Sequence, residues 1–146
     1  MTNYWILVGD EDSWTALLKS GYWVLKGGYK KRARKIREGD KAVAYVKFFS
    51  SIFGVIEITS NPYYEETTSA LGEPIGVYPI RFKIKPKLFL KEPTSIRPLI
   101  KRLNFIQNKE KWYSYFQTSI RKIDEKDFEL ILSHLTEKFR ERPSLK

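Results

Sequence analysis

Residues 21–37 read GYWVLKGGYKKRARKIR, and the rest of the chain is expected to be organised around this stretch. Its three aromatic side chains, Trp23 among them, offer flat π surfaces, and Gly27 and Gly28 let the backbone approach a ligand closely or adopt positive φ. Seven of its residues are lysine or arginine. Aromatic planes beside a cationic rim are what the binding of a nucleobase and its phosphate requires.

The same stretch also has a purely structural interpretation. Trp23 would then pack in the core, the glycines would turn a loop and the cations would coat a solvated helix, since aromatic side chains pack more often than they bind. The sequence leaves both interpretations open.

The chain is strongly basic, with 27 Lys and Arg against 17 Asp and Glu and a formal net charge of +10. Such a balance favours an anionic partner, nucleic acid before an anionic membrane surface. Two blocks carry the excess: residues 26–47 hold nine cations and two anions, and residues 81–111 hold ten cations and two anions. They form one patch if the fold brings them together, and two solvated faces if it does not.

Composition excludes several kinds of chemistry. The chain has 146 residues, and we expect a single domain over residues 1–146. It has no cysteine and one histidine, His134, which excludes disulfides, cysteine nucleophiles and histidine-cluster metal sites, so no cofactor is expected. No stretch resembles a signal peptide or a membrane span, which favours a cytoplasmic protein. Abundant Lys and Glu without cysteine is typical of a heat-adapted source.

The first elements are a strand and a capped helix. Residues 3–8 (NYWILV) are too apolar for an exposed edge and predict a central strand. A helix follows, capped by Asp10 or Asp12 and closed by Gly21. Trp14 lies on its apolar stripe, which places this tryptophan in the core.

A hairpin is expected after the basic stretch. The loop that carries Trp23 leads into a short basic helix or helical turn over residues 30–37. Residues 41–48 and 52–59 then predict two strands of a hairpin. Glu57 on the second strand has two interpretations, an ion pair with a neighbouring Lys or Arg and a catalytic carboxylate.

The middle of the chain is expected to be a long loop followed by a basic strand. Residues 61–76 contain two prolines and two glycines, and Tyr64 in this loop either closes over a site or anchors the loop. Residues 77–91 alternate and predict a strand whose outer face carries Arg81 and four lysines. Pro86 predicts an edge position or a bulge.

Helical elements are expected at the C-terminal end. Residues 95–103 predict a short amphipathic helix, and residues 104–117 predict a loop with a short strand. Asp124 is placed to cap the last and strongest helix, on which His134 lies off the apolar stripe and should be solvated. The tail over residues 141–146 is expected to fray.

This order of elements does not alternate as βαβ units do, and it predicts the α+β class with a curved or closed barrel. The chain resembles the EVE domain, a branch of the PUA-like superfamily related to the YTH domain, over roughly residues 3–135. The features that carry the resemblance are, in order, the initial YWILV strand, Trp23 some sixteen residues ahead of the Gly39-Asp40 turn, the AVAYVK strand, the FGVIEI strand and the FQTSIRKIDEKDF segment that opens the last helix.

The resemblance implies a PUA-like curved β-barrel of about five to six strands flanked by helices, with an aromatic pocket for a modified base flipped out of DNA or RNA. Trp23 matches the tryptophan that stacks on the base in the relatives. Val77, Tyr78 and Pro79 fall near the place where YTH relatives supply another wall of the cage, and none of them is a tryptophan. Many EVE domains have Arg-Asn after the tryptophan, where this chain reads Gly27-Gly28-Tyr29.

The candidate site residues fall into two groups. For base binding we expect Trp23 as the stacking residue, with Tyr22, Tyr29, Tyr64 and Tyr78 as walls. For phosphate binding we expect Lys30, Lys31, Arg32, Arg34, Lys83, Lys85 and Lys87.

The principal hypothesis is therefore a non-catalytic reader of modified nucleic acid, without catalytic or metal-binding residues. The runner-up is a PUA-like hydrolase of the ASCH type that acts on modified nucleosides, with a pocket lysine and Glu57 as its acid–base pair. A third reading is a small-anion or metabolite sensor that uses the same cationic pocket.

Overall fold

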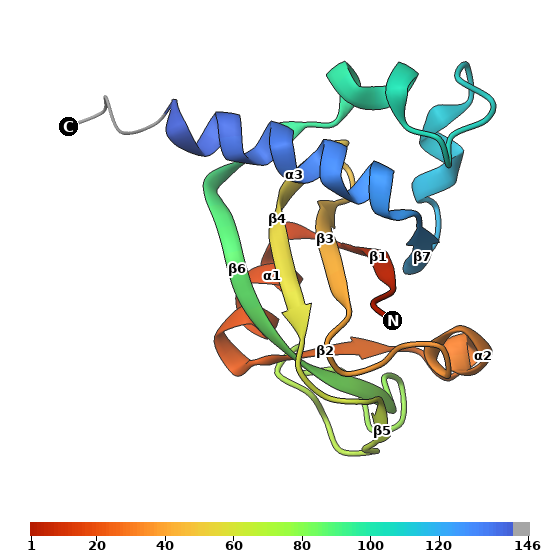
Figure 1. Ribbon diagram of the computed structural model, residues 1–146. Helices are drawn as coiled ribbons and strands as arrows, with labels where there is room; N and C mark the ends of the chain where they lie inside the picture. Colours follow the sequence, from red (N-terminus) through yellow and green to blue (C-terminus); the bar gives the residue numbers. More distant parts are fainter. Residues whose placement is uncertain (142–146) are drawn as a thin grey trace.

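The computed structural model describes residues 1–141, which form a curled mixed sheet with helices on both faces (Figure 1). The strands are β1 (Tyr4–Gly9), β2 (Tyr22–Leu25), β3 (Lys41–Val46), β4 (Ser51–Ile58), β5 (Tyr63–Tyr64), β6 (Ile80–Ser95) and β7 (Ile120–Ile123). The α-helices are α1 (Glu11–Ser20), α2 (Lys30–Ala33) and α3 (Glu125–Arg140), and the 3₁₀ segments are η1 (Gly27–Tyr29), η2 (Arg97–Arg102) and η3 (Trp112–Phe116).

Six strands follow one another in the order β2-β6-β4-β3-β1-β7, and β5 pairs with β6 beside this path. The curled sheet makes a half-barrel, so the expected α+β class and PUA-like curvature are confirmed. β1 and β3 are parallel, with Trp5 opposite Ala42. Parallel neighbours need a long crossover connection. Residues 10–40 supply it, and they contain α1, the edge strand β2 and α2.

The two faces of the sheet bury two separate cores. The first contains Trp5, Trp14, Trp23 and Phe82, and it lies under α1 and β2. The second lies under α3, which crosses the sheet in Figure 1, and it includes Tyr45, whose ring stacks on Phe116 at a centroid distance of 4.1 Å. The candidate site is built on the first of these faces.

Several local predictions are confirmed. Asp10 caps α1 by accepting a hydrogen bond from the Ser13 backbone N–H at 2.7 Å, and Gly21 ends the helix at φ 87°. β3 and β4 form the expected antiparallel hairpin. Asp124 caps α3 by accepting from the Asp127 N–H at 2.8 Å. Capping and hairpin pairing depend on neighbours in sequence, so the pattern is sufficient to predict them.

The stretch around Trp23 differs from its prediction. Trp23 lies in strand β2 and not in a loop, because the strand pairs with β6 and places Trp23 opposite Phe82. The helix expected over residues 30–37 is only the four-residue α2, preceded by the 3₁₀ turn η1. The pairing partner of β2 is some sixty residues away, which no local pattern reveals.

The basic strand also differs from its prediction. It runs over Ile80–Ser95, and Pro86 lies at a register shift in its pairing with β4, which confirms the bulge. Arg81, expected on the outer face, is buried at 4% exposure. Its guanidinium lies 3.8 Å from the Glu73 carboxylate and donates to the Thr67 carbonyl, so it holds the 61–76 loop against the sheet.

The C-terminal predictions need further corrections. The segment expected to be an α-helix over 95–103 is the 3₁₀ segment η2, and the strand expected within 104–117 is replaced by η3. His134 is not simply solvated, because its Nε2 is buried and makes no hydrogen bond to the described residues. Beyond residue 141, the expected fraying lies outside the described residues.

Candidate nucleic-acid-binding site

A cavity of about 100 Å³ lies where β1 ends, on the face of the sheet that carries Trp23. This is several times the roughly 10–15 Å³ that one water molecule needs. Tryptophan and tyrosine rings meet polar groups in its lining. The lining residues with chemical character are Asp10, Ser13, Trp23, Lys47, Tyr78 and Ser119.

Trp23 belongs both to the core and to the cavity. Its side chain is only 3% exposed, and its ring stacks on Trp14 with centroids 3.9 Å apart and planes inclined by 29°. Yet the Trp23 Nε1–H is buried and finds no acceptor among residues 1–141. A buried donor without a partner is destabilising by about 1–3 kcal/mol, and such groups are rare in folded proteins. The nitrogen is also sealed from solvent, so a ligand in the cavity reaches it only if the lining shifts.

Gly9 fixes the position of the Trp23 indole. A Cβ atom at residue 9 would lie 2.7 Å from Cη2 of Trp23 and 3.4 Å from Nε1 of Trp14. Only glycine therefore allows the indole to pack over the end of β1. Glycine is needed at position 9 because the Trp23 ring approaches the backbone closely, and not because the backbone turns there.

Donors and acceptors of opposite charge face the cavity. The Ser13 backbone N–H, assisted by the charge of Lys47, holds the pKa of the Asp10 carboxyl below its ordinary value. Asp10 is thus an ionised acceptor, and Lys47 is a donor on the same lining. This pattern can pair with a planar group that carries both N–H donors and ring or carbonyl acceptors.

Tyr29 supports the cavity from behind its lining. Its hydroxyl accepts a hydrogen bond from the Ser119 backbone N–H at 3.0 Å. The guanidinium of Arg32 lies 5.6 Å from the Tyr29 ring centroid, and its Nη1 donates to Thr118 Oγ1 at 2.7 Å and to the Ile120 carbonyl at 2.9 Å. These contacts fasten α2 to the segment that leads into β7.

The remaining base-binding candidates are placed differently. Tyr78 lines the cavity beside Trp23. Tyr22, the strand neighbour of Trp23, points to the other side of β2, where its hydroxyl accepts from the Ala70 N–H at 2.9 Å. Tyr64 is 56% exposed on β5 and lines a separate groove. The structure therefore brings Trp23 and Tyr78 together, with Tyr29 behind them, and leaves Tyr22 and Tyr64 outside the lining.

Two basic grooves flank α2. One, of about 280 Å³, lies between α2 and β5, and the other, of about 290 Å³, lies between α2 and β7. The first is lined by Lys30, Arg34, Arg37, Asn61 and Tyr64, with three apolar neighbours. The second is lined by Trp5, Arg32, Lys35, Ile120, Arg121 and Lys122.

The second groove concentrates positive charge. Arg121 donates from Nε to the Tyr115 carbonyl at 2.9 Å, and both burial and the nearby charge of Arg32 lower its pKa. Among residues 1–141, no carboxylate forms a salt bridge with Arg32, Lys35, Arg121 or Lys122. Cations held together without an anion favour a polyanionic ligand.

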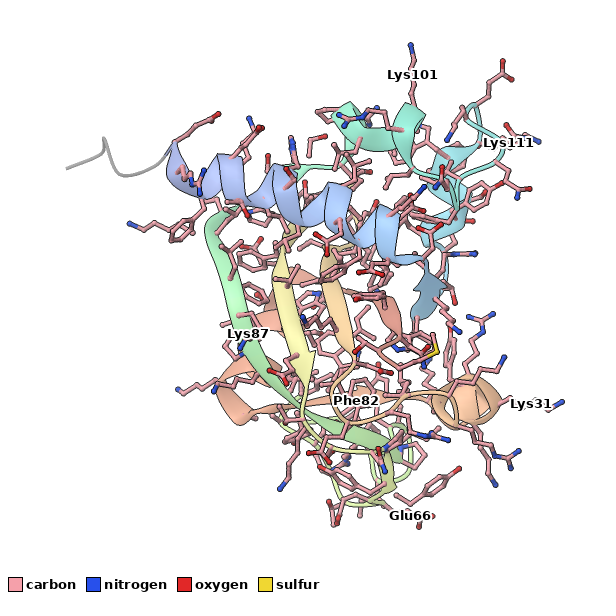
Figure 2. The ribbon with its side chains drawn as sticks, viewed as in Figure 1. Lys31, Glu66, Phe82, Lys87, Lys101 and Lys111 are labelled. Carbon is pink, nitrogen blue, oxygen red and sulfur yellow. The ribbon has the colours of Figure 1, made fainter. Side chains whose placement is uncertain are left out.

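The lysines of β6 are not part of this surface. Figure 2 shows Lys87 and Lys31 projecting from opposite sides of the molecule. Lys87 pairs with Glu57 at 3.5 Å, so the ion-pair interpretation of Glu57 holds. Lys83 and Lys85 on the same strand line neither groove nor the cavity. Lys87 on β6 therefore lies on a different side of the molecule from the cations of α2.

Sequence reasoning did not name five cations of the cavity and the two grooves as site residues: Lys35, Arg37, Lys47, Arg121 and Lys122. The one local signal for the last two was a pair of cations between Ile120 and Ile123, in a segment that the prediction assigned to the approach of the last helix. Within residues 1–141, no three His, Asp or Glu side chains are grouped to hold a metal ion. None of the helices described is long and apolar enough to cross a bilayer.

Comparison with known proteins identifies the fold. A family model of the EVE domain matches residues 3–134. A UPF0310 protein of Pyrococcus abyssi is 33% identical over 143 residues, which cover 91% of this chain and 99% of the relative. Two solved structures are similar at low sequence identity: Rpa0253 from Rhodopseudomonas palustris (TM-score 0.64, 20% identity, 93% of this chain and 94% of that one) and the YTH domain of the Zygosaccharomyces rouxii MRB1 protein in complex with N6-methyladenosine RNA (TM-score 0.70, 17% identity, 92% and 86%).

Proposed function

The chain belongs to the EVE domain family, and from this premise we propose that it is a nucleic-acid-binding module that holds a modified base in the Trp23 cavity. The base would be flipped out of an RNA or DNA strand whose phosphates lie along the grooves beside α2. The relative from Zygosaccharomyces rouxii, with its YTH fold and its N6-methyladenosine RNA, supports this class of ligand.

The observation that carries the proposal is a single cavity whose lining presents the Trp23 ring together with Asp10 and Lys47. A carboxylate acceptor and an ammonium donor thus lie beside an aromatic side chain. A nucleobase edge carries the complementary donors and acceptors in one plane.

The energetics are compatible with base flipping. Extruding a base from a duplex costs a few kcal/mol, and less from a single strand. Contact with an aromatic face contributes about 1–3 kcal/mol per base. Hydrogen bonds to the charged groups of the lining add to this, so one well-fitting base recovers the cost of leaving its stack.

Phosphate binding would come from the groove between α2 and β7. The Tyr29–Ser119 hydrogen bond joins this groove to the cavity, since Ser119 lines the cavity and Tyr29 immediately precedes α2. Arg32 and Arg121 are held in place by backbone carbonyls, so their charge is presented without further ordering. Such contacts position a strand without reading its sequence.

The test is a comparison of matched oligonucleotides and free nucleosides. Trp23→Phe keeps an aromatic ring but reduces its stacking surface, and we expect it to reduce the preference for a modified base, with N6-methyladenosine and 5-methylcytosine as first probes. Trp112→Phe, a tryptophan on η3 outside the cavity lining, is the control. A Trp23→Phe variant that discriminates as well as the parent protein would refute the proposal.

We propose no catalytic role. The pocket lysine and Glu57 of the hydrolase alternative are not brought together, because Glu57 lies outside the cavity and pairs with the exposed Lys87. Release of free base or deacylated nucleoside during the binding measurements would contradict this assignment.

A further inference from the structure

The turn between β3 and β4 presents two aromatic rings to solvent. Phe48 is 82% exposed and Phe49 is 65% exposed, more than any other aromatic side chain among residues 1–141. Folding buries phenylalanine when it can, because a fully exposed ring gains nothing from the hydrophobic effect. Two such rings at the tip of one hairpin are therefore unusual on a solvent-exposed surface.

The backbone conformation at Phe48 is also unfavourable for a phenylalanine. Phe48 has φ 77°, in the left-handed region that glycine and asparagine adopt readily and that bulky side chains avoid. Ser50, two residues on, is also left-handed at φ 50°. A residue kept in an unfavourable conformation where glycine would serve better points to a role other than folding.

The turn is held firmly on both sides. The Lys47 N–H donates to the Gly9 carbonyl at 3.0 Å, and the Ile96 N–H donates to the Ser50 carbonyl at 3.0 Å. Ser51 Oγ donates to the Phe49 carbonyl at 2.9 Å. Because the backbone is anchored in this way, the rings are presented to a ligand with little conformational entropy left to lose.

The tip adjoins the candidate base cavity. Lys47 lines the cavity, and its Nζ lies 5.3 Å from the centroid of the Phe48 ring. Gly9, to which Lys47 is hydrogen bonded, lines the same cavity. A ligand that fills the cavity and continues past Lys47 therefore meets the aromatic tip next.

We propose that Phe48, with Phe49 beside it, stacks on the base adjacent to the one held in the Trp23 cavity. The inference rests on the proposed function. A flipped base leaves its neighbour in the strand without a stacking partner, and an aromatic side chain can take that place whatever the neighbour's identity. Lys47 lies between the two bases, where it can contact the phosphate that joins them.

The charge and the size of the tip favour a nucleic-acid strand over a protein partner. A stable protein interface buries roughly 1,200–2,000 Å² in total, whereas two rings flanked by a lysine make a small contact surface. Single-stranded nucleic acid is bound by this combination of isolated aromatic rings and cations.

Phe48→Gly separates binding from folding. Glycine removes the ring and is at ease at positive φ, so we expect the melting temperature to stay the same or rise. Affinity for a nine-nucleotide single strand with one central N6-methyladenosine should fall about tenfold, the loss expected for one stacked base. Binding of free N6-methyladenosine nucleoside should not change. Phe48→Trp should retain oligonucleotide affinity, and Tyr113→Ala, at an exposed aromatic on η3, should have no effect.

Each outcome of these measurements supports or refutes the stacking role of Phe48. Unchanged oligonucleotide affinity in Phe48→Gly refutes the stacking role, even if Trp23→Phe shows that the base cavity is real. If Phe48→Gly weakens oligonucleotide binding while the parent protein does not distinguish modified from plain bases, the stacking role stands and the base-reader proposal fails. Self-association that sedimentation detects in the parent protein and not in Phe48→Gly would assign the tip to a second copy of the chain and overturn the inference.

Discussion

Trp14 and Trp23 stack with ring centroids 3.9 Å apart, one ring from α1 and the other from β2. The two indole nitrogens differ in their hydrogen bonding. Trp14 Nε1 donates to the Tyr45 carbonyl at 3.0 Å, whereas Trp23 Nε1 has no acceptor among the described residues. The pair thus joins a satisfied core residue to one that faces the candidate base cavity, and the surrounding packing decides how far the second ring can move.

Gly9→Ala should disturb this pair directly. The new Cβ would meet the Trp23 ring at 2.7 Å, and overpacking of this kind is destabilising by about 1–3 kcal/mol. We expect a lower free energy of unfolding in urea and weaker nucleoside binding. Gly28→Ala is the matched control, since nothing lies within 4 Å of its new Cβ and its φ is not positive. Equal stability of the two variants would show that the Trp23 ring yields without penalty.

Removing two lysines should change the salt dependence of nucleic-acid binding. Lys35 and Lys122 line the groove beside Arg32, and neither ammonium makes a hydrogen bond or salt bridge among residues 1–141, so Lys35→Gln with Lys122→Gln should leave folding intact. Each phosphate contact on a single strand contributes about 0.7 to the slope of log K against log salt, so the double variant should lower the slope by about 1.4.

The control for that experiment removes the same charge elsewhere. Lys101 and Lys111 project from the upper end of the molecule in Figure 2, whereas α2 lies at the lower right. Lys101→Gln with Lys111→Gln should leave the salt slope unchanged. Similar slopes for both double variants would mean that binding responds to net charge and not to the groove.

Glu73 should make the stability of the 61–76 loop depend on pH. Burial of Glu73 opposes its ionisation, but hydrogen bonds from Ser69 and the charge of Arg81 prevail and hold its pKa below the ordinary 4.5. A carboxyl whose pKa is lower in the folded state stabilises the fold above its unfolded pKa, and that contribution is lost as the pH falls through the lower value. Glu73→Gln should therefore melt a few degrees lower than the parent protein at pH 7. The difference should shrink as the pH falls below 4.5 and vanish below the lowered, folded-state pKa of Glu73. Thermal unfolding monitored at several pH values is the measurement, and a difference that persists at low pH would contradict the assignment.

Asp40 should be essential for the turn that ends the crossover connection over residues 10–40. Its carboxylate is 1% exposed and accepts hydrogen bonds from the Asn3 N–H at 2.9 Å, Trp5 Nε1 at 3.0 Å and the Arg37 N–H at 2.9 Å. Asp40→Ala leaves these donors unpaired, and we expect a loss of about 3 kcal/mol or more in denaturant unfolding. Asp12→Ala, at an exposed position of α1, should cost far less. Comparable losses would show that water replaces the buried carboxylate.

Part of the site was predictable because it depends on residue type alone. Trp23 and Tyr78 were expected in the pocket, and the structure places both on the cavity lining. Arg32 was expected to bind phosphate, and it lies in the more basic groove, although phosphate contact itself stays a prediction. Tyr22 is also aromatic and is the sequence neighbour of Trp23. Because side chains alternate along strand β2, Tyr22 lies on the other face of the strand.

By itself the sequence determined the caps of α1 and α3 and the β3–β4 hairpin, because each depends on a few neighbouring residues and on the fixed geometry of helix and strand. At Pro86 it predicted an edge position or a bulge, and the pairing of β6 with β2 and β4 leaves the bulge. Only the tertiary structure decided that Arg32 meets the segment around Arg121, that Arg81 is buried and that Lys87 of β6 lies on a different side of the molecule from Lys31. Those arrangements follow from which strands pair and how far the sheet curls. Such pairings join residues sixty to ninety positions apart, and they are selected by the burial of whole faces, which no short pattern encodes.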